Sequence, residues 1–139
     1  MPADLTTEDQ LVTDIVAYFA AHPPVSLPVV DFRSNAERPL PCVIIGHDGA
    51  EREHARGMYG TGRVKLSAVI QSDLDATVPT AHRAYTGAID AAIMALKDAQ
   101  VLALSYVHAV LPEGAANHID DRREYTSQSY TIVATRCSS

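Results

Sequence analysis

Apolar residues recur at helical spacing near the start of the chain. Between residues 6 and 21 they fall on one face of an amphipathic helix, and they are Leu11, Val12, Ile15, Val16 and Phe19. Thr7 and Gln10 have the spacing of a capping box, in which two side chains satisfy free backbone N–H groups at a helix start. Pro23 and Pro24 are expected to end this helix, because proline cannot continue the hydrogen-bond ladder.

A second helical pattern runs from Thr77 to Asp98. Thr77 is the expected cap, and Pro79 is compatible with the first turn, where no backbone N–H is needed. One stripe of this helix carries small and apolar side chains that let it lie close to a sheet: Ala81, Tyr85, Ala88, Ile89, Ala92, Ile93 and Leu96.

Alternation of apolar and polar residues predicts the strands. The clearest strand covers residues 63–73, where Val64, Leu66, Ala68 and Ile70 share one face and charged or polar residues take the other. Residues 42–45 form a continuous apolar run that is typical of a strand buried on both faces. We expect further strands at residues 29–33, 101–111 and 124–136, with residues 112–123 as a polar link between the last two.

The expected order of elements is therefore α-β-β-β-α-β-β. Strands in runs, single helices between them and hairpin-length links favour an α+β fold. We expect one domain over residues 1–139, with a mainly antiparallel sheet and two main helices packed on one face. Residues 48–62 are expected to form a flexible arm, because Gly49, Gly57, Gly60 and Gly62 give that segment backbone freedom.

Composition narrows the classes of function. The 139 residues carry a net charge of −6 and only two lysines, which argues against a protein that grips nucleic acid through phosphate contacts. The start of the chain has neither a basic segment nor a long apolar run, so we expect no signal peptide and no membrane span. Cys42 and Cys137 do not form a CxxC pair, and we expect reduced thiols.

Residue patterns that could carry chemistry do not meet its physical requirements. The glycines of GMYGTG, residues 57–62, run into a strand, whereas a phosphate loop leads into a helix N-terminus. The acids and histidines of HDGAEREH, residues 47–54, fall on opposite faces of an extended segment, so we expect no metal site. His82 and His108 lie within expected regular elements, where we expect packed or surface residues, because a catalytic base also requires an orienting carboxylate and a substrate pocket. No GxSxG elbow is present. We expect no enzyme activity, catalytic residue or cofactor.

Two charged segments are candidates for protein contacts instead. Asp120, Asp121, Arg122 and Arg123 lie together in the polar link, where acids and arginines can pair with a neighbouring subunit. A solvated turn is the open alternative for this cluster. In the arm, the candidate contact residues are Glu51, Arg52, Glu53, Arg56 and Tyr59.

The sequence resembles the small tail-terminator and tail-completion (minor tail) proteins of long-tailed bacteriophages. The resemblance covers most of the chain: a capped helix ending at AHPP, a proline-rich extended segment, a strand pair joined by a polar glycine-containing loop, the helix AHRAYTGAIDAAIMAL and a final strand. It implies an α+β subunit that forms a homohexameric ring at the head-proximal end of the tail tube.

The resemblance also implies a function and partners. Such a ring would end tube growth, contact the tail tube protein and dock the head-completion or neck protein. It would be made in the host cytoplasm and reside in the virion, with DNA passing through the ring without specific binding. The alternative that the residues leave open is a small cytoplasmic α+β enzyme or ligand-binding domain with a cleft lined by His47, His54 or His82.

Overall fold

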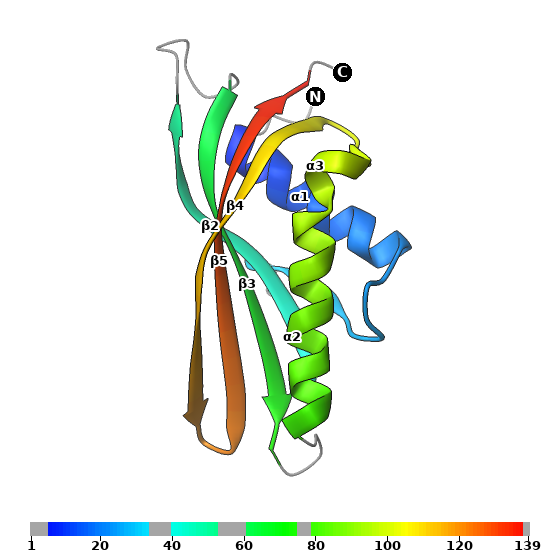
Figure 1. The fold of residues 1–139 in the computed structure, drawn as a ribbon, viewed down its shortest axis with the longest axis vertical. Helices are drawn as coiled ribbons and strands as arrows, with labels where there is room; N and C mark the ends of the chain where they lie inside the picture. The colour runs from blue at the N-terminus through cyan, green and yellow to red at the C-terminus, as the bar shows by residue number, and fades with distance from the viewer. Residues whose placement is uncertain (1–5, 34–39, 53–60, 75–78, 138–139) are drawn as a thin grey trace.

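The computed structural model describes residues 6–33, 40–52, 61–74 and 79–137. Its elements, in chain order, are α1 (Thr7–Ala21), β1 (Val29–Asp31), β2 (Cys42–Arg52), β3 (Thr61–Asp73), α2 (Pro79–Met94), α3 (Leu96–Ala99), β4 (Ser105–Asp120) and β5 (Arg123–Arg136). The predicted order α-β-β-β-α-β-β is confirmed, with α3 as a short addition directly after α2 (Figure 1).

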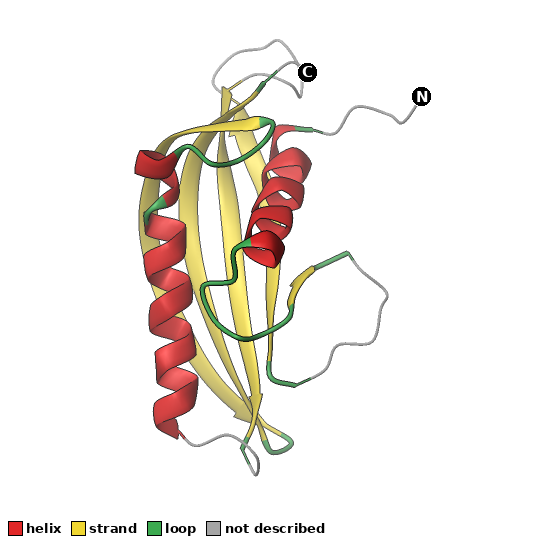
Figure 2. Cartoon of the chain, turned by 90° about the vertical axis from the view of Figure 1, so that its right-hand side faces the viewer, coloured by secondary structure: helices red, strands yellow, loops and turns green. Residues whose placement is uncertain are grey.

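The five strands form one mixed sheet in the order β1-β2-β3-β5-β4. Only β1 and β2 pair in parallel, and the β2–β3, β3–β5 and β4–β5 pairs are antiparallel. The helices α1 and α2 cover the same face of this sheet, so the predicted α+β domain with helices on one face is confirmed (Figure 2).

The core lies between that face and the two helices. Alternate residues of β3 point into it, and Val64, Ala68 and Ile70 are completely buried. Their cross-strand partners on β5 continue the layer, because Ile132 pairs with Val64 and Tyr130 pairs with Leu66. Each large aliphatic side chain buried in this way stabilises the fold by about 1.5 to 3 kcal/mol.

The cap of α1 differs from the prediction by one residue. Thr6 has extended backbone angles, and its Oγ1 accepts the N–H of Asp9 at 3.2 Å. Thr7 is already helical and buried, so it cannot be the cap. The predicted partner Gln10 donates instead to Oδ1 of Asp14 at 2.7 Å.

The prediction of a loop at residues 112–123 is wrong. β4 continues to Asp120 and pairs with β5 along the whole segment. Pro112 and Gly114 have the composition of a turn, but they flank a break in register, where an irregular strand tolerates a missing N–H and the φ of +137° at Gly114. β2 likewise continues past the predicted residue 45 and absorbs Gly49, at φ +110°, in an irregularity between His47 and Ala50.

Candidate contact surface

The turn between β4 and β5 is a two-residue hairpin tip. Asp121 and Arg122 have φ values of 48° and 61°, the left-handed conformation that asparagine and glycine usually supply in such turns. Asp120 pairs with Arg123 across the tip, and Arg122 O accepts the N–H of Leu74 at 2.9 Å. The four predicted contact residues are thus brought together on one exposed tip, at one end of the long axis of the molecule (Figure 1).

The second predicted contact group lies elsewhere. Arg52 pairs with Gly62 at the start of β3, whereas Arg123 pairs with Asp73 at its end. Eleven residues of strand separate these points, which is roughly 36 Å. Glu51 and Arg52 belong to β2, and Glu53, Arg56 and Tyr59 lie outside the described residues, as does most of the predicted arm.

The outer half of β4 is exposed on both of its faces. Every residue from Leu111 to Asp120 is exposed, in contrast to the buried positions at the start of the strand. Leu111 and Ile119 are 50% and 58% exposed, high values for large aliphatic side chains. β4 is also an edge strand, so this segment offers side chains and backbone groups to a partner.

A series of hydrogen-bonded polar side chains connects this hairpin to α2 and β3. His82, on α2, is 2% exposed and bonds Ser72 Oγ through Nδ1 at 2.7 Å and Thr126 Oγ1 through Nε2 at 2.8 Å. Thr126 donates to Oδ1 of Asn117 at 3.0 Å, and Asn117 donates to Glu124 at 3.0 Å. Because the Thr126 hydroxyl is used as a donor there, it accepts from Nε2–H of His82, and Nδ1 accepts from Ser72.

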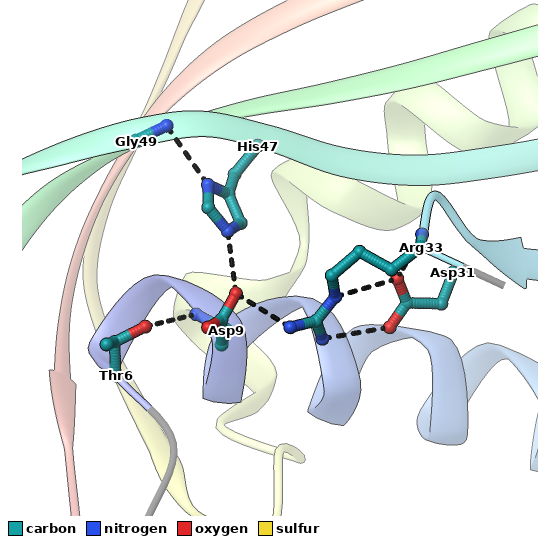
Figure 3. A network of polar contacts seen from close by, with 6 residues as sticks. All are labelled: Thr6, Asp9, Asp31, Arg33, His47 and Gly49. Carbon is teal, nitrogen blue, oxygen red and sulfur yellow. Dashed lines mark hydrogen bonds and ion pairs between the residues drawn. The ribbon is translucent and has the colours of Figure 1, made fainter.

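A second polar network joins α1 to the β1–β2 edge (Figure 3). Asp9 Oδ1 accepts from Nε2 of His47 at 2.8 Å and lies 3.0 Å from Nη1 of Arg33. Gly49 donates its N–H to Nδ1 of His47 at 3.0 Å, which fixes the proton of the neutral ring on Nε2. Burial acts to raise the pKa of Asp9, but the bond from His47 and the charge of Arg33 together lower it.

A hollow of about 280 Å³ opens between α2 and the hairpin. Asp90, Gln128 and Tyr130 line it, together with Pro112, Gly114, Ala115 and Ser129. The Tyr130 hydroxyl lies 2.6 Å from Oδ1 of Asp90 and 3.2 Å from Oε1 of Gln128. Burial, the hydrogen bond to Asp90 and the charge of Asp90 all raise the pKa of Tyr130, so this hydroxyl keeps its proton and donates it.

Two of the three histidines proposed to line a cleft make hydrogen bonds within the chain through both ring nitrogens. His47 and His82 each use both ring nitrogens in hydrogen bonds, and neither lines the larger hollows of the described surface; His54 lies outside the described residues. Across the described ranges no group of three or more His, Cys, Asp or Glu side chains could hold a metal ion. No helix among these residues is long and apolar enough to cross a membrane.

Sequence patterns missed the polar networks. His82 was expected to be a packed or surface residue, and its partners are ten and 44 positions away in the chain. The available signal is its place on α2, three residues before Tyr85 and seven before Ile89, on the stripe that faces the sheet. That spacing predicts burial, and a buried histidine requires partners.

Comparison with known proteins shows similarity in fold and not in sequence family. No family model matches the chain, and no curated protein matches it. Among solved structures, the chain is similar to one described as the virion of a native gene transfer agent particle, with 13% sequence identity and a TM-score of 0.54. The match covers 94% of this chain and 92% of the other, so the likeness extends over the whole fold.

Proposed function

We propose that this chain is a structural protein of a phage-like virion. The observation that carries the proposal is the similarity in fold to a chain of the gene transfer agent virion, which covers nearly the full length of both chains. The tail-terminator resemblance of the sequence supports the same class of protein independently. The finer proposal is a homohexameric ring at the head-proximal end of a tail tube, which ends tube growth and joins the tail to the neck.

The β4–β5 hairpin supports a role in assembly. Exposed ion pairs contribute only about 0 to 1 kcal/mol each to a single subunit, so the charges of the tip are a weak device for stability. Across a boundary between subunits, the same charges are partly desolvated and disfavour incorrect docking. The tip combines charge with apolar surface, because Ile119 is exposed beside Asp120 and Arg123.

Charge and chemistry are consistent with a passive conduit. Six copies of a chain with a net charge of −6 make a strongly acidic ring, which repels the phosphates of DNA and lets the duplex pass without specific binding. The bonded state of His47 and His82 argues against either ring as a catalytic base, because both nitrogens of each ring are used in hydrogen bonds within the chain.

Reversal of charge at the hairpin tip tests the role in assembly. The double variant Arg122→Glu, Arg123→Glu should keep the fold while its rings dissociate at higher protein concentration than those of the parent. The defect should grow as salt is lowered, because repulsion is then less screened. Light scattering measures assembly, and circular dichroism measures the fold.

The matched control reverses two exposed charges on the helices, Arg83→Glu and Lys97→Glu. This control changes the net charge by the same amount and should assemble like the parent. If the tip variant and the control assemble equally well at low salt, the hairpin tip is a solvated turn and has no part in the interface.

A further inference from the structure

The hollow beside Asp90 contains more hydrogen-bond acceptors than the chain supplies donors for. The single Tyr130 hydroxyl proton goes to the nearer and charged Asp90, at 2.6 Å. Gln128 uses its Nε2 to donate to the backbone oxygen of Thr86 at 3.0 Å. The same hydroxyl also lies within hydrogen-bond distance of Gln128 Oε1, at 3.2 Å, so a single proton serves two acceptors there.

Rotation of the Gln128 amide does not solve this problem. The flipped amide would donate to Tyr130, but its oxygen would then face the oxygen of Thr86 at 3.0 Å. The base of the hollow thus presents Gln128 Oε1, the Tyr130 oxygen and the carboxylate of Asp90, all of which accept. A group that only donates and carries positive charge satisfies all three.

A guanidinium group fits this requirement best. It carries five donors, no acceptor and a permanent charge, and it binds a carboxylate through two parallel hydrogen bonds. The hollow, of about 280 Å³, has room for a single inserted side chain. The apolar walls at Pro112 and Ala115 suit the methylene stem of such a side chain.

The described arginines differ in their availability. Arg33 is held by Asp9 and Asp31, and interactions are also made by Arg63, Arg122 and Arg136. Of the arginines whose side chains the structure describes, Arg83 and Arg123 remain as exposed ones, and Arg83 lies on the same helix as Asp90 within the body of the subunit. Arg123 lies on the hairpin tip at the end of the molecule, where it can approach another copy (Figure 1).

We infer that the hollow formed by Asp90, Gln128 and Tyr130 receives Arg123 from a second copy of this chain. Within one chain the contact is excluded, because Arg123 and Gln128 are five residues apart on one extended strand, or roughly 16 Å. A tip that docks on the flank of the next subunit is a head-to-tail contact, and such contacts form a ring when the rotation from one subunit to the next closes. The inference rests on the proposed ring and names one contact within it.

Two single variants and their mixture test the contact. Asp90→Asn removes the charge and adds a donor to the hollow, yet keeps an acceptor for the Tyr130 hydroxyl. Arg123→Gln removes the cation from an exposed position, where folding is not at risk. Each variant should raise the concentration for half-assembly by about tenfold or more, as expected for loss of a charged hydrogen-bonded pair. Arg83→Gln is the matched control and should assemble like the parent.

Mixing the two variants tests whether the contact joins different copies. The Asp90→Asn subunit still supplies Arg123, and the Arg123→Gln subunit still supplies Asp90, so one intact contact forms per pair. Native mass spectrometry should then show dimers that contain one subunit of each variant, at a concentration where either variant by itself remains monomeric.

Three results would overturn the inference. Normal rings from Arg123→Gln would exclude the contact while leaving the proposed ring in place. An assembly defect found only in Arg83→Gln would do the same. A parent protein that stays monomeric at its highest soluble concentration would remove both the contact and the ring.

Discussion

Replacement of His82 by leucine should destabilise the fold strongly, because it breaks a buried polar chain. Leucine fills a similar volume, so the main loss is that of hydrogen bonds. Ser72 is 1% exposed and would lose the acceptor for its hydroxyl, while Thr126 is only partly buried and can turn to water. The unsatisfied hydroxyl of Ser72 costs about 1 to 3 kcal/mol and the lost hydrogen bond to Thr126 about 0.5 to 1.5 kcal/mol, so we expect a total loss of about 2 to 4 kcal/mol.

Urea unfolding followed by circular dichroism, at protein concentrations below assembly, measures this loss. With a slope of about 1 to 3 kcal/mol per molar urea, the midpoint should fall by about 1 M or more. His108→Leu is the control: His108 is exposed and bonds Thr135 at 2.7 Å, so its replacement should change stability by less than about 0.5 kcal/mol.

The double variant Ser72→Ala, His82→Leu makes the test sharper. Removal of both partners of a buried hydrogen bond can be nearly neutral, whereas removal of one leaves the other unsatisfied. We therefore expect the double variant to be more stable than His82→Leu alone. Equal midpoints for His82→Leu and His108→Leu, or a double variant no more stable than His82→Leu, would refute the role assigned to His82.

Three further predictions concern other parts of the fold. Asp9→Asn should lower the free energy of unfolding by about 1 kcal/mol near pH 7. The difference from the parent should vanish in acid, because the stabilisation by ionised Asp9 is present above its ordinary pKa and is lost as pH falls through the lowered pKa of the folded state. Urea titration at a series of pH values measures this difference. Gly46→Ala should cost about 1 to 3 kcal/mol in the same assay, because a Cβ would lie 2.8 Å from Cγ of Phe32. Asp121→Asn with Arg122→Gly should raise stability in thermal melts by about 1 kcal/mol, because both positions have positive φ.

Element order and core could be predicted because their signals are local. The alternation from Val64 to Ile70 identified the buried face of β3, and the stripe with Ile89 and Ile93 identified that of α2. The long β4 could not be predicted, since Pro112 and Gly114 have the composition of a turn, and only pairing with β5 keeps them in a strand.

The candidate site could be predicted only in part. Asp120 to Arg123 stand together in the sequence, so their clustering was visible before the fold. Asp90 and Tyr130 are 40 residues apart and meet because α2 covers the face of the sheet toward which Tyr130 points. Hydrogen-bond satisfaction in their hollow depends on side-chain geometry, which no periodicity in the sequence encodes.

The state of assembly of the purified protein tests the central proposal most directly. Negative-stain microscopy with native mass spectrometry should show rings of six subunits with a central hole, and addition of these rings should stop elongation of tail tubes in vitro. A monomer or dimer that leaves tube length unchanged would contradict the proposal that this chain ends the growth of a virion tail.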